Sequence, residues 1–162
     1  MTVPCISRNG AIALILLSLS ATPGLAQDCA PETAVEAFVE AIRSNDGPAL
    51  NAMVLDSADA IFFGTDGAER WAGNDAVIAA FEAQLAAFRT TGVDTTDMVV
   101  LANPDCDAAA FSGTWEWRIA AGEQNVALEG LRVTGALFRD EDDWRLAGFH
   151  FSMPVGGQAV PY

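Results

Sequence analysis

The sequence predicts an α+β domain in which three N-terminal helices pack on one face of a strongly curved, mostly antiparallel sheet. Apolar residues recur with helical spacing in the first part of the mature chain, and everything after the third helix has the pattern of strands. Helices followed by a run of antiparallel strands are typical of this fold class. A bent sheet closed by helices leaves a cone-shaped cavity, and that shape suits a ligand.

Residues 1–26 have the pattern of a secretory signal peptide. Arg8 precedes the apolar run 11–17, and the small-residue segment 24–26 predicts cleavage after Ala26. The run is shorter than the roughly 20 residues that span a bilayer, so a retained anchor is the weaker alternative. We therefore expect a periplasmic or secreted protein that has no contact with the membrane after cleavage.

The mature chain is strongly acidic. Removal of Arg8 leaves seven arginines against 22 acidic residues, a net charge of −15. Such a surface repels nucleic acid and anionic lipid, so neither is an expected partner. All eight basic residues are arginines, which excludes a Schiff-base lysine.

Two cysteines remain after cleavage, Cys29 and Cys106. An oxidising compartment favours a structural disulfide between them, which would tie the start of the first helix to a loop between strands. A redox-active pair is the alternative, but the chain has no C-x-x-C spacing.

Helical patterns occupy the first part of the expected domain, which covers residues 27–154. The segment 31–43 carries apolar residues at the i, i+3, i+4, i+7 spacing of a helix with one buried face, and a short helix is expected over 49–55. Asn74 can cap a third helix that runs to about Arg89.

Strand patterns follow. Short strands are expected at 60–63 and 71–73, and longer ones at 98–102, 108–119, 126–139 and 143–153. Within 108–119 apolar or small residues alternate with polar ones, so one face is buried. Residues 155–162 are expected to form a flexible tail.

Two segments resemble a known family. The first is Phe62-Phe63-Gly64-Thr65-Asp66 followed by Glu69, Trp71 and Gly73, and the second contains Arg132-x-Thr134, Arg139, Trp144 and Phe149-His150-Phe151-Ser152. The first resembles a loop of SnoaL-like domains of the nuclear transport factor 2 superfamily. The second is similar to the last hairpin of those domains and of the calcium/calmodulin-dependent kinase association domain. The resemblance spans about residues 30–154.

This resemblance implies a cone-shaped α+β barrel, commonly dimeric through the outer sheet face, with a pocket lined by the long strands. It implies no single activity, because relatives include polyketide cyclases, ketosteroid isomerases, dehydratases, epoxide hydrolases and members that only bind or assemble. The chain departs from two of these groups. Its only tyrosine is Tyr162, whereas the isomerases use a pocket tyrosine, and its only histidine is His150, whereas the dehydratases use more than one.

The register of the last hairpin decides which side chains share a face, because a slip of one residue turns every side chain over. If Arg139 pairs with Trp144, Arg132 lies opposite Phe151. If a bulged turn pairs Arg139 with Asp143, Arg132 lies opposite His150. We favour the bulged turn, because it places Phe138 beside Trp144, an aromatic cross-strand pair.

In the favoured register, a polar line of Arg132, Thr134, His150 and Ser152 faces the pocket. His150 would then be a general acid or base, and Arg132 would stabilise an oxyanion. A hydrogen-bonded core histidine and a structural ion pair are the alternatives. Asp66 could accept a proton at the cavity mouth, although Thr65-Asp66-Gly67 is also good turn chemistry.

Thr134, Ser152, Trp71 and Trp115 are candidate ligand-binding residues, although aromatic residues at alternating strand positions are more often core. The acidic run 140–143 lacks the spaced ligands of a calcium loop, and no metal or other cofactor is expected. Three hypotheses stay open: a domain that binds a small, largely apolar molecule, an isomerase, lyase or hydrolase, and a non-catalytic dimeric interaction module. A cavity that reaches His150 and Arg132 would favour the first two.

Overall fold

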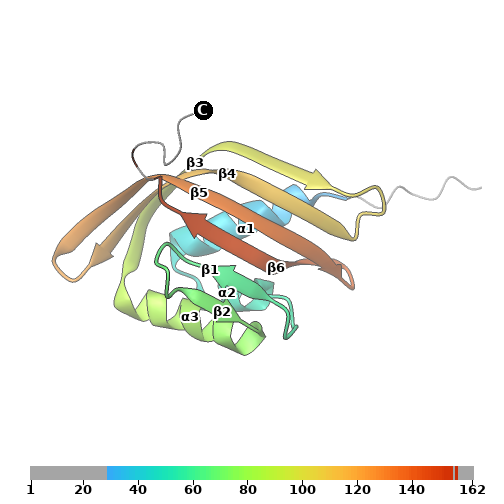
Figure 1. Ribbon diagram of the computed structural model, residues 1–162, viewed down its shortest axis with the longest axis horizontal. Helices are drawn as coiled ribbons and strands as arrows, with labels where there is room; N and C mark the ends of the chain where they lie inside the picture. The colour runs from blue at the N-terminus through green and yellow to red at the C-terminus, as the bar shows by residue number, and fades with distance from the viewer. Residues whose placement is uncertain (1–28, 155, 157–162) are drawn as a thin grey trace, which may run out of the picture.

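The computed structural model describes residues 29–154 and 156, and Figure 1 shows helices packed against one curved sheet. The expected signal peptide and all but Gly156 of the last eight residues lie outside this part of the chain. The elements in chain order are α1 (Pro31–Ser44), α2 (Gly47–Met53), β1 (Ile61–Phe63), β2 (Arg70–Ala72), α3 (Asn74–Ala87), β3 (Arg89–Ala102), β4 (Ala108–Ala121), β5 (Gln124–Asp140) and β6 (Asp143–Ser152).

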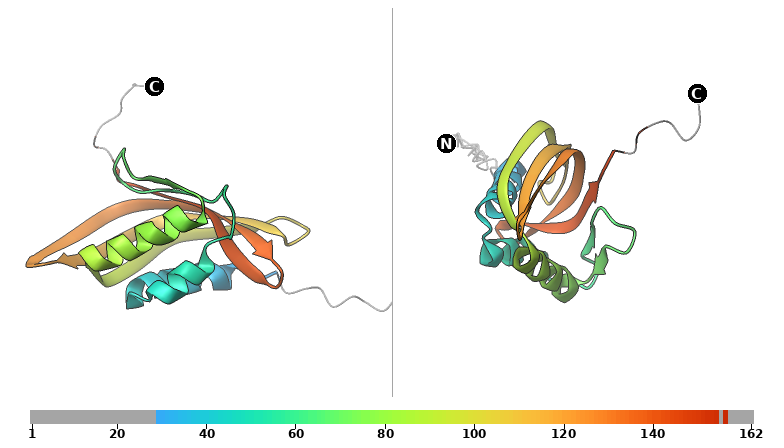
Figure 2. Two further views of the ribbon diagram at one scale, coloured as in Figure 1. Left: turned by 90° about the horizontal axis from the view of Figure 1, so that it is seen from below. Right: turned by 90° about the vertical axis from the view of Figure 1, so that its left-hand side faces the viewer.

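The strand order is β2-β1-β6-β5-β4-β3, and β1 and β6 form a parallel pair in an otherwise antiparallel sheet. Both further views in Figure 2 show the helices on the inner side of a sheet that curls around them. The predicted α+β cone is therefore confirmed. Sequence periodicity located the helices to within a few residues at each end, because each has an apolar stripe.

The N-terminus of α3 corrects one sequence-based assignment. The N-cap is Gly73, with φ +90°, and no side chain caps the helix there. Asn74 is the first helical residue, and its Nδ2 donates to the backbone oxygens of Leu55 and Val54, at 3.0 and 3.4 Å. Its amide therefore holds the α2–β1 connection against α3.

The third strand begins at Arg89, well before the predicted Met98. Its first half, Thr-Thr-Gly-Val-Asp-Thr-Thr-Asp, lacks apolar alternation because β3 is an edge strand and buries few side chains there. Only Thr90 and Val93 are buried in that half. The buried Thr90 hydroxyl accepts a hydrogen bond from the indole nitrogen of Trp117 at 3.0 Å, which satisfies both polar groups.

Bulges curve the sheet, and on β5 and β6 they coincide with buried or partly buried apolar residues that are spaced by three instead of two. On β5 the shift lies between Leu128 and Leu131, next to Gly130 at φ +66°, and on β6 it lies between Leu146 and Phe149. A strand turns alternate side chains to opposite faces, so an extra residue is needed to return both members of such a pair to one face. The bulges therefore let the strands bend while the core face stays apolar.

The core lies between the inner face of the sheet and the helices. Its largest fully buried side chains are Trp115, Phe38, Leu131, Leu137 and Leu146. Phe149 joins this group, with its ring centroid 4.8 Å from that of Phe38 and 4.4 Å from that of Phe151, both edge-on. Such aromatic contacts add to the burial of apolar area that stabilises the domain.

Candidate functional site

The β5–β6 hairpin has neither of the two expected registers. Its turn is the simple one, with Arg139 opposite Trp144, so the favoured bulged turn is wrong. Phe138 consequently lies opposite Arg145 and makes no direct pair with Trp144. The extra residue is Ala147, in the middle of β6, where the three-residue spacing from Leu146 to Phe149 requires it.

The bulge brings the four polar residues of the hairpin onto one face. Arg132 lies opposite Ser152, and Thr134 lies opposite His150; we call these four residues the polar row. Their neighbours along the strands, Leu131, Val133, Phe149 and Phe151, are buried, so the polar row faces outward. Arg132, Thr134 and His150 are exposed and Ser152 is half-buried. The prediction that these side chains line an interior pocket is therefore corrected, because the pocket side belongs to the apolar residues between them.

His150 contacts an aromatic ring on the same outer face. Phe63 on β1 is its cross-strand partner, and the two ring centroids lie 6.0 Å apart in an edge-on arrangement. Among the hydrogen bonds of the described residues, none involves the side chain of His150 or Arg132. The alternatives of a satisfied core histidine and a buried arginine ion pair are therefore excluded by this exposure.

Side chains fill the interior of the cone beneath α3. Two voids of about 20 Å³ each remain beneath α3, and both are bordered by Phe81, Gln84 and Phe151. A space of that size holds no more than one water molecule. Trp115 is fully buried in the core, and its indole nitrogen has no hydrogen-bond partner within the described part of the chain.

The β1–β2 loop holds Asp66 in a local turn. Its Oδ1 accepts from the backbone nitrogen of Ala68 at 2.9 Å, and its own backbone nitrogen donates to Glu69 Oε2 at 3.0 Å. These bonds are the turn chemistry that the Thr-Asp-Gly sequence predicts. Trp71, on β2 beyond this loop, is half-buried and borders one of the two small voids.

The predicted disulfide between Cys29 and Cys106 is present, with Cα atoms 5.4 Å apart and a sequence separation of 77. It ties the start of α1 to the β3–β4 turn. The indole nitrogen of Trp144 donates to the Cys29 backbone oxygen at 2.9 Å, which adds β6 to the same junction. The bridge therefore joins the N-terminal segment to the end of the sheet that carries the β3–β4 and β5–β6 turns.

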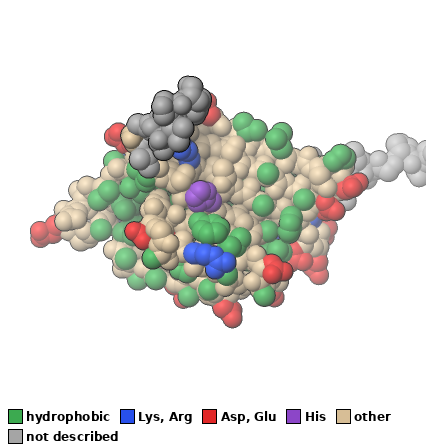
Figure 3. Space-filling view, in the orientation of Figure 1, with side chains coloured by type: hydrophobic (Ala, Val, Ile, Leu, Met, Phe, Trp, Pro, Cys, Tyr) green, Lys and Arg blue, Asp and Glu red, His purple; other side chains and the backbone are tan. Residues whose placement is uncertain are grey.

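Large apolar side chains lie exposed on the outer face, around the polar row. We call Phe63, Val99, Leu101 and Phe138 the outer apolar patch; they are 38%, 49%, 68% and 48% exposed. The space-filling view in Figure 3 shows this face, with the histidine near its centre, apolar and cationic side chains close by and most acidic side chains around the edge. The centre of this face is therefore less acidic than the net charge of the chain would suggest.

Residues 29–154 and 156 contain no group of three or more histidine, cysteine or acidic side chains that could hold a metal ion. Within the same residues, no helix has the length and apolar character needed to cross a membrane.

A family model described as a SnoaL-like domain matches residues 32–156. The chain therefore belongs to the family of SnoaL-like domains, as its two motifs indicated. No curated protein sequence matches it.

Solved structures with the same fold include three with TM-scores of 0.64, two of which are NTF2-like proteins. One is a candidate dehydratase from Streptomyces avermitilis, at 22% identity over 77% of this chain and 94% of that one. Another is a protein of unknown function in nutrient uptake from Rhodospirillum rubrum, at 18% identity over 77% and 98%. The third is a candidate calcium/calmodulin-dependent protein kinase II association domain from Xanthomonas campestris, at 14% identity over 78% and 86%. At these identities the likeness establishes the fold alone.

Proposed function

We propose that this chain is a non-catalytic SnoaL-like module that forms a homodimer through the outer face of its sheet. The carrying observation is that the interior beneath α3 is filled, whereas the outer face of the sheet exposes the outer apolar patch. Several large apolar side chains exposed on one face of a protein favour an interaction surface there. The polar row at the centre would supply the hydrogen-bonding groups that protein interfaces also contain.

The test is the mass of the protein in solution by sedimentation equilibrium, for the parent and for the double variant Leu101→Asp/Phe138→Asp. The parent should be a dimer and the double variant a folded monomer, because each dimer would bury four new charges. Val126→Asp is the matched control, since Val126 is also 38% exposed but lies away from the patch, near the tip of β5. A parent that is monomeric at about 100 μM, where micromolar dimers are largely formed, would overturn the proposal.

Binding of a small apolar molecule is the second candidate, and the two adjacent voids beneath α3 favour it. Phe81, Gln84 and Phe151 separate them, so rearrangement of these side chains would join the voids, with the Gln84 amide as a polar contact. Native mass spectrometry of the purified protein tests this. A co-purified molecule that is lost in Phe81→Trp, which fills the space, would support it; a mass equal to the chain alone would count against it.

An enzyme that uses His150 and Arg132, assisted by Asp66, is supported less. The substrate would have to bind at the exposed polar row, which the proposed dimer covers. Turnover that rises in the monomeric double variant and disappears in His150→Ala would favour the enzyme over the interaction module.

We also propose that the protein is exported to the periplasm or beyond the cell. The pattern of residues 1–26 supports this, as does a disulfide, a bond that persists in oxidising compartments. Expression of the full chain in a Gram-negative host, followed by fractionation and intact-mass measurement, should find the periplasmic form starting at Gln27. A full-length, reduced form in the cytoplasm would contradict this proposal.

A further inference from the structure

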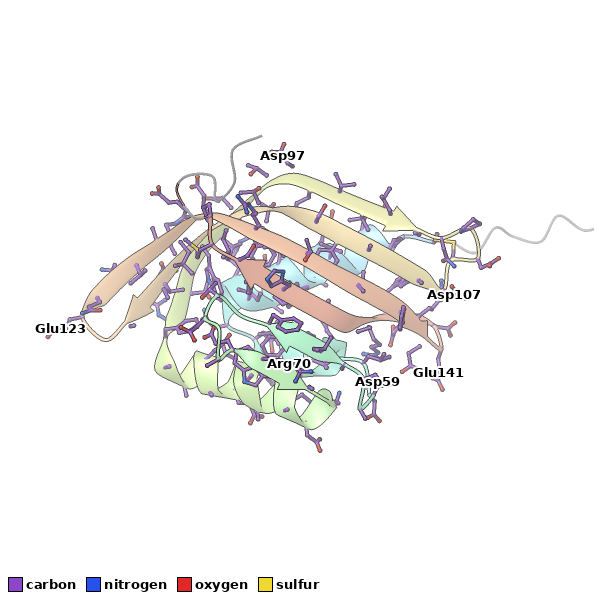
Figure 4. The ribbon with its side chains drawn as sticks, in the orientation of Figure 1. Asp59, Arg70, Asp97, Asp107, Glu123 and Glu141 are labelled. Carbon is purple, nitrogen blue, oxygen red and sulfur yellow. A yellow bond between two sulfur atoms is a disulfide. The ribbon has the colours of Figure 1, made fainter. Side chains whose placement is uncertain are left out.

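The edge strand β3 is covered over only part of its length. The Asn45 amide exchanges two hydrogen bonds with the backbone of Thr90, at 2.7 and 3.1 Å, and Arg43 Nη2 donates to the Val93 backbone oxygen at 2.9 Å. Beyond Val93, no described residue outside β4 hydrogen-bonds to the backbone of β3. The second half of the strand therefore has a free edge (Figure 4, where Asp97 marks it).

Successive residues of an antiparallel strand direct their backbone N–H and C=O groups to opposite sides. This alternation identifies which residues of β3 present these groups at the free edge. Because the Val93 oxygen points away from β4 to reach Arg43, the polar backbone groups of Thr95 do so as well. At the other end, the backbone nitrogen of Asn103 donates to the Ala108 oxygen, so the groups of Val100 and Ala102 point away from β4. The edge from Thr95 to Ala102 spans about 25 Å. A bulge between Thr96 and Val99, with Asp97 at φ 52°, divides it, so an added strand would pair on both sides of the bulge.

A groove of about 620 Å³ runs between this edge and α1. Its floor is apolar, formed by the buried Val35 and Val39 of α1 together with the partly buried Met98 and Val100 of β3. Gly113 of β4 makes room for the Met98 side chain, because a Cβ there would overlap its sulfur atom. The floor is therefore part of the packed structure and does not depend on a mobile loop.

The rim of the groove is acidic. Glu32 and Glu36 lie one turn apart on α1 and are exposed, and neither takes part in an ion pair with a described residue. The one cation in the groove, Arg43, is already bound by Glu40 at 2.7 Å and by the Val93 oxygen. The unpaired charges at the rim are therefore negative, and a positively charged ligand would complement them.

We infer that this groove binds an extended segment of a partner protein that carries both apolar side chains and lysine or arginine, and that the segment adds to β3 as a further strand. Its backbone would pair with Thr95, Val100 and Ala102, its apolar side chains would cover the floor, and its cations would reach Glu32 and Glu36. Addition of a strand to an exposed edge is a common way for proteins to bind peptides. A second copy of this chain is a poorer occupant, because it would bring further negative charge to an acidic rim.

The probe is a fluorescent octapeptide made of two Val-Val-Lys-Lys repeats, so that each face of the extended peptide carries both residue types. Its binding to the parent protein is measured by anisotropy. The charge-reversed peptide, with glutamate in place of lysine, should not bind. The double variant Glu32→Gln/Glu36→Gln should bind the lysine peptide about fivefold more weakly, the effect of losing two exposed ion pairs. Glu123→Gln/Glu129→Gln is the matched control, because it removes equal charge from exposed positions on the β4–β5 hairpin, and it should bind as the parent does.

A second pair of variants tests the added strand. Thr95→Pro removes an outward backbone N–H that β4 does not use, and an edge strand tolerates proline there; binding should be lost. Thr95→Val keeps the N–H and should bind as the parent does. Absence of parent binding at about 1 mM peptide, or equal weakening by both glutamate pairs, would overturn the inference. If Thr95→Pro fails to fold by circular dichroism, the glutamate variants decide alone. Sedimentation of the same variants distinguishes this groove from the outer face, since the proposed dimer should persist in all of them.

Discussion

Thr134 and His150 lie directly opposite each other on β5 and β6, and both side chains point to solvent on the outer face of the sheet. Val133 and Phe149, the adjacent residues of the two strands, are buried. The two polar residues are therefore neighbours, as expected of one site, but they belong to the outer face, through which we propose that the dimer forms, and not to the interior of the cone.

This placement predicts the reactivity of His150. In the monomeric Leu101→Asp/Phe138→Asp variant, diethyl pyrocarbonate should modify the imidazole rapidly, because His150 is exposed. In the parent dimer the same reaction should be several-fold slower. Mass spectrometry of the His150 peptide measures both rates, with Val126→Asp as the control that should react like the parent. Equal rates in parent and monomer would argue that the dimer leaves this face open.

Loss of the Cys29–Cys106 bridge should destabilise the fold. Closing a loop between cysteines with a sequence separation of 77 contributes about 4 kcal/mol in the chain-entropy model. Urea unfolding of the parent, of Cys29→Ser/Cys106→Ser and of the reduced parent measures the loss. The variant and the reduced parent should agree. An unchanged midpoint in both would show that tertiary packing alone holds the N-terminal segment.

Two strand glycines should respond differently to alanine. A Cβ at Gly135 would overlap the Phe111 ring and lie 3.0 Å from the Gly148 backbone oxygen, so Gly135→Ala should cost about 1–3 kcal/mol by overpacking. At Gly148 the nearest atom would be the Ile61 oxygen at 3.7 Å, an ordinary contact, so Gly148→Ala is the matched control. Thermal unfolding compares them. Equal effects would mean that the Phe111 ring moves aside freely.

Asn45 is expected to stabilise the junction of α1 with β3 in two ways. It ends α1 in the left-handed conformation, at φ 60°, and its side chain makes both hydrogen bonds to Thr90. Asn45→Gly keeps the backbone conformation but loses those bonds, which should cost about 1–3 kcal/mol. Asn45→Ala should cost roughly 1 kcal/mol more, because alanine disfavours that conformation. Denaturant unfolding tests the order, and alanine that is no worse than glycine would contradict it.

Much of the fold was predictable from local patterns. The three helices follow from apolar spacing, and the β4 strand follows from alternation through Phe111, Trp115 and Trp117. The first half of β3 was missed because an edge strand that buries only Thr90 and Val93 has no apolar period. The bulge at Ala147 has a signal in the sequence, the three-residue spacing between the apolar residues Leu146 and Phe149.

The candidate site was predictable as a set of residues and not as a location. That Arg132, Thr134, His150 and Ser152 share a face depends on a bulge of one residue, and which face they share depends on where the apolar neighbours pack. The exposure of His150 could not be obtained from its neighbours alone, since aromatic residues surround it in the sequence on both sides.

By itself, the sequence determined the family, the α+β class, the cysteine pair and the acidity of the chain, because these depend on residue types and on spacing along the chain. Only the tertiary structure decided which side of the sheet is covered by helices, how fully side chains occupy the cone, and where β3 is left without a neighbour. Those properties arise from contacts between residues far apart in the chain, and a shift of one residue in a strand reverses the face to which every later side chain points.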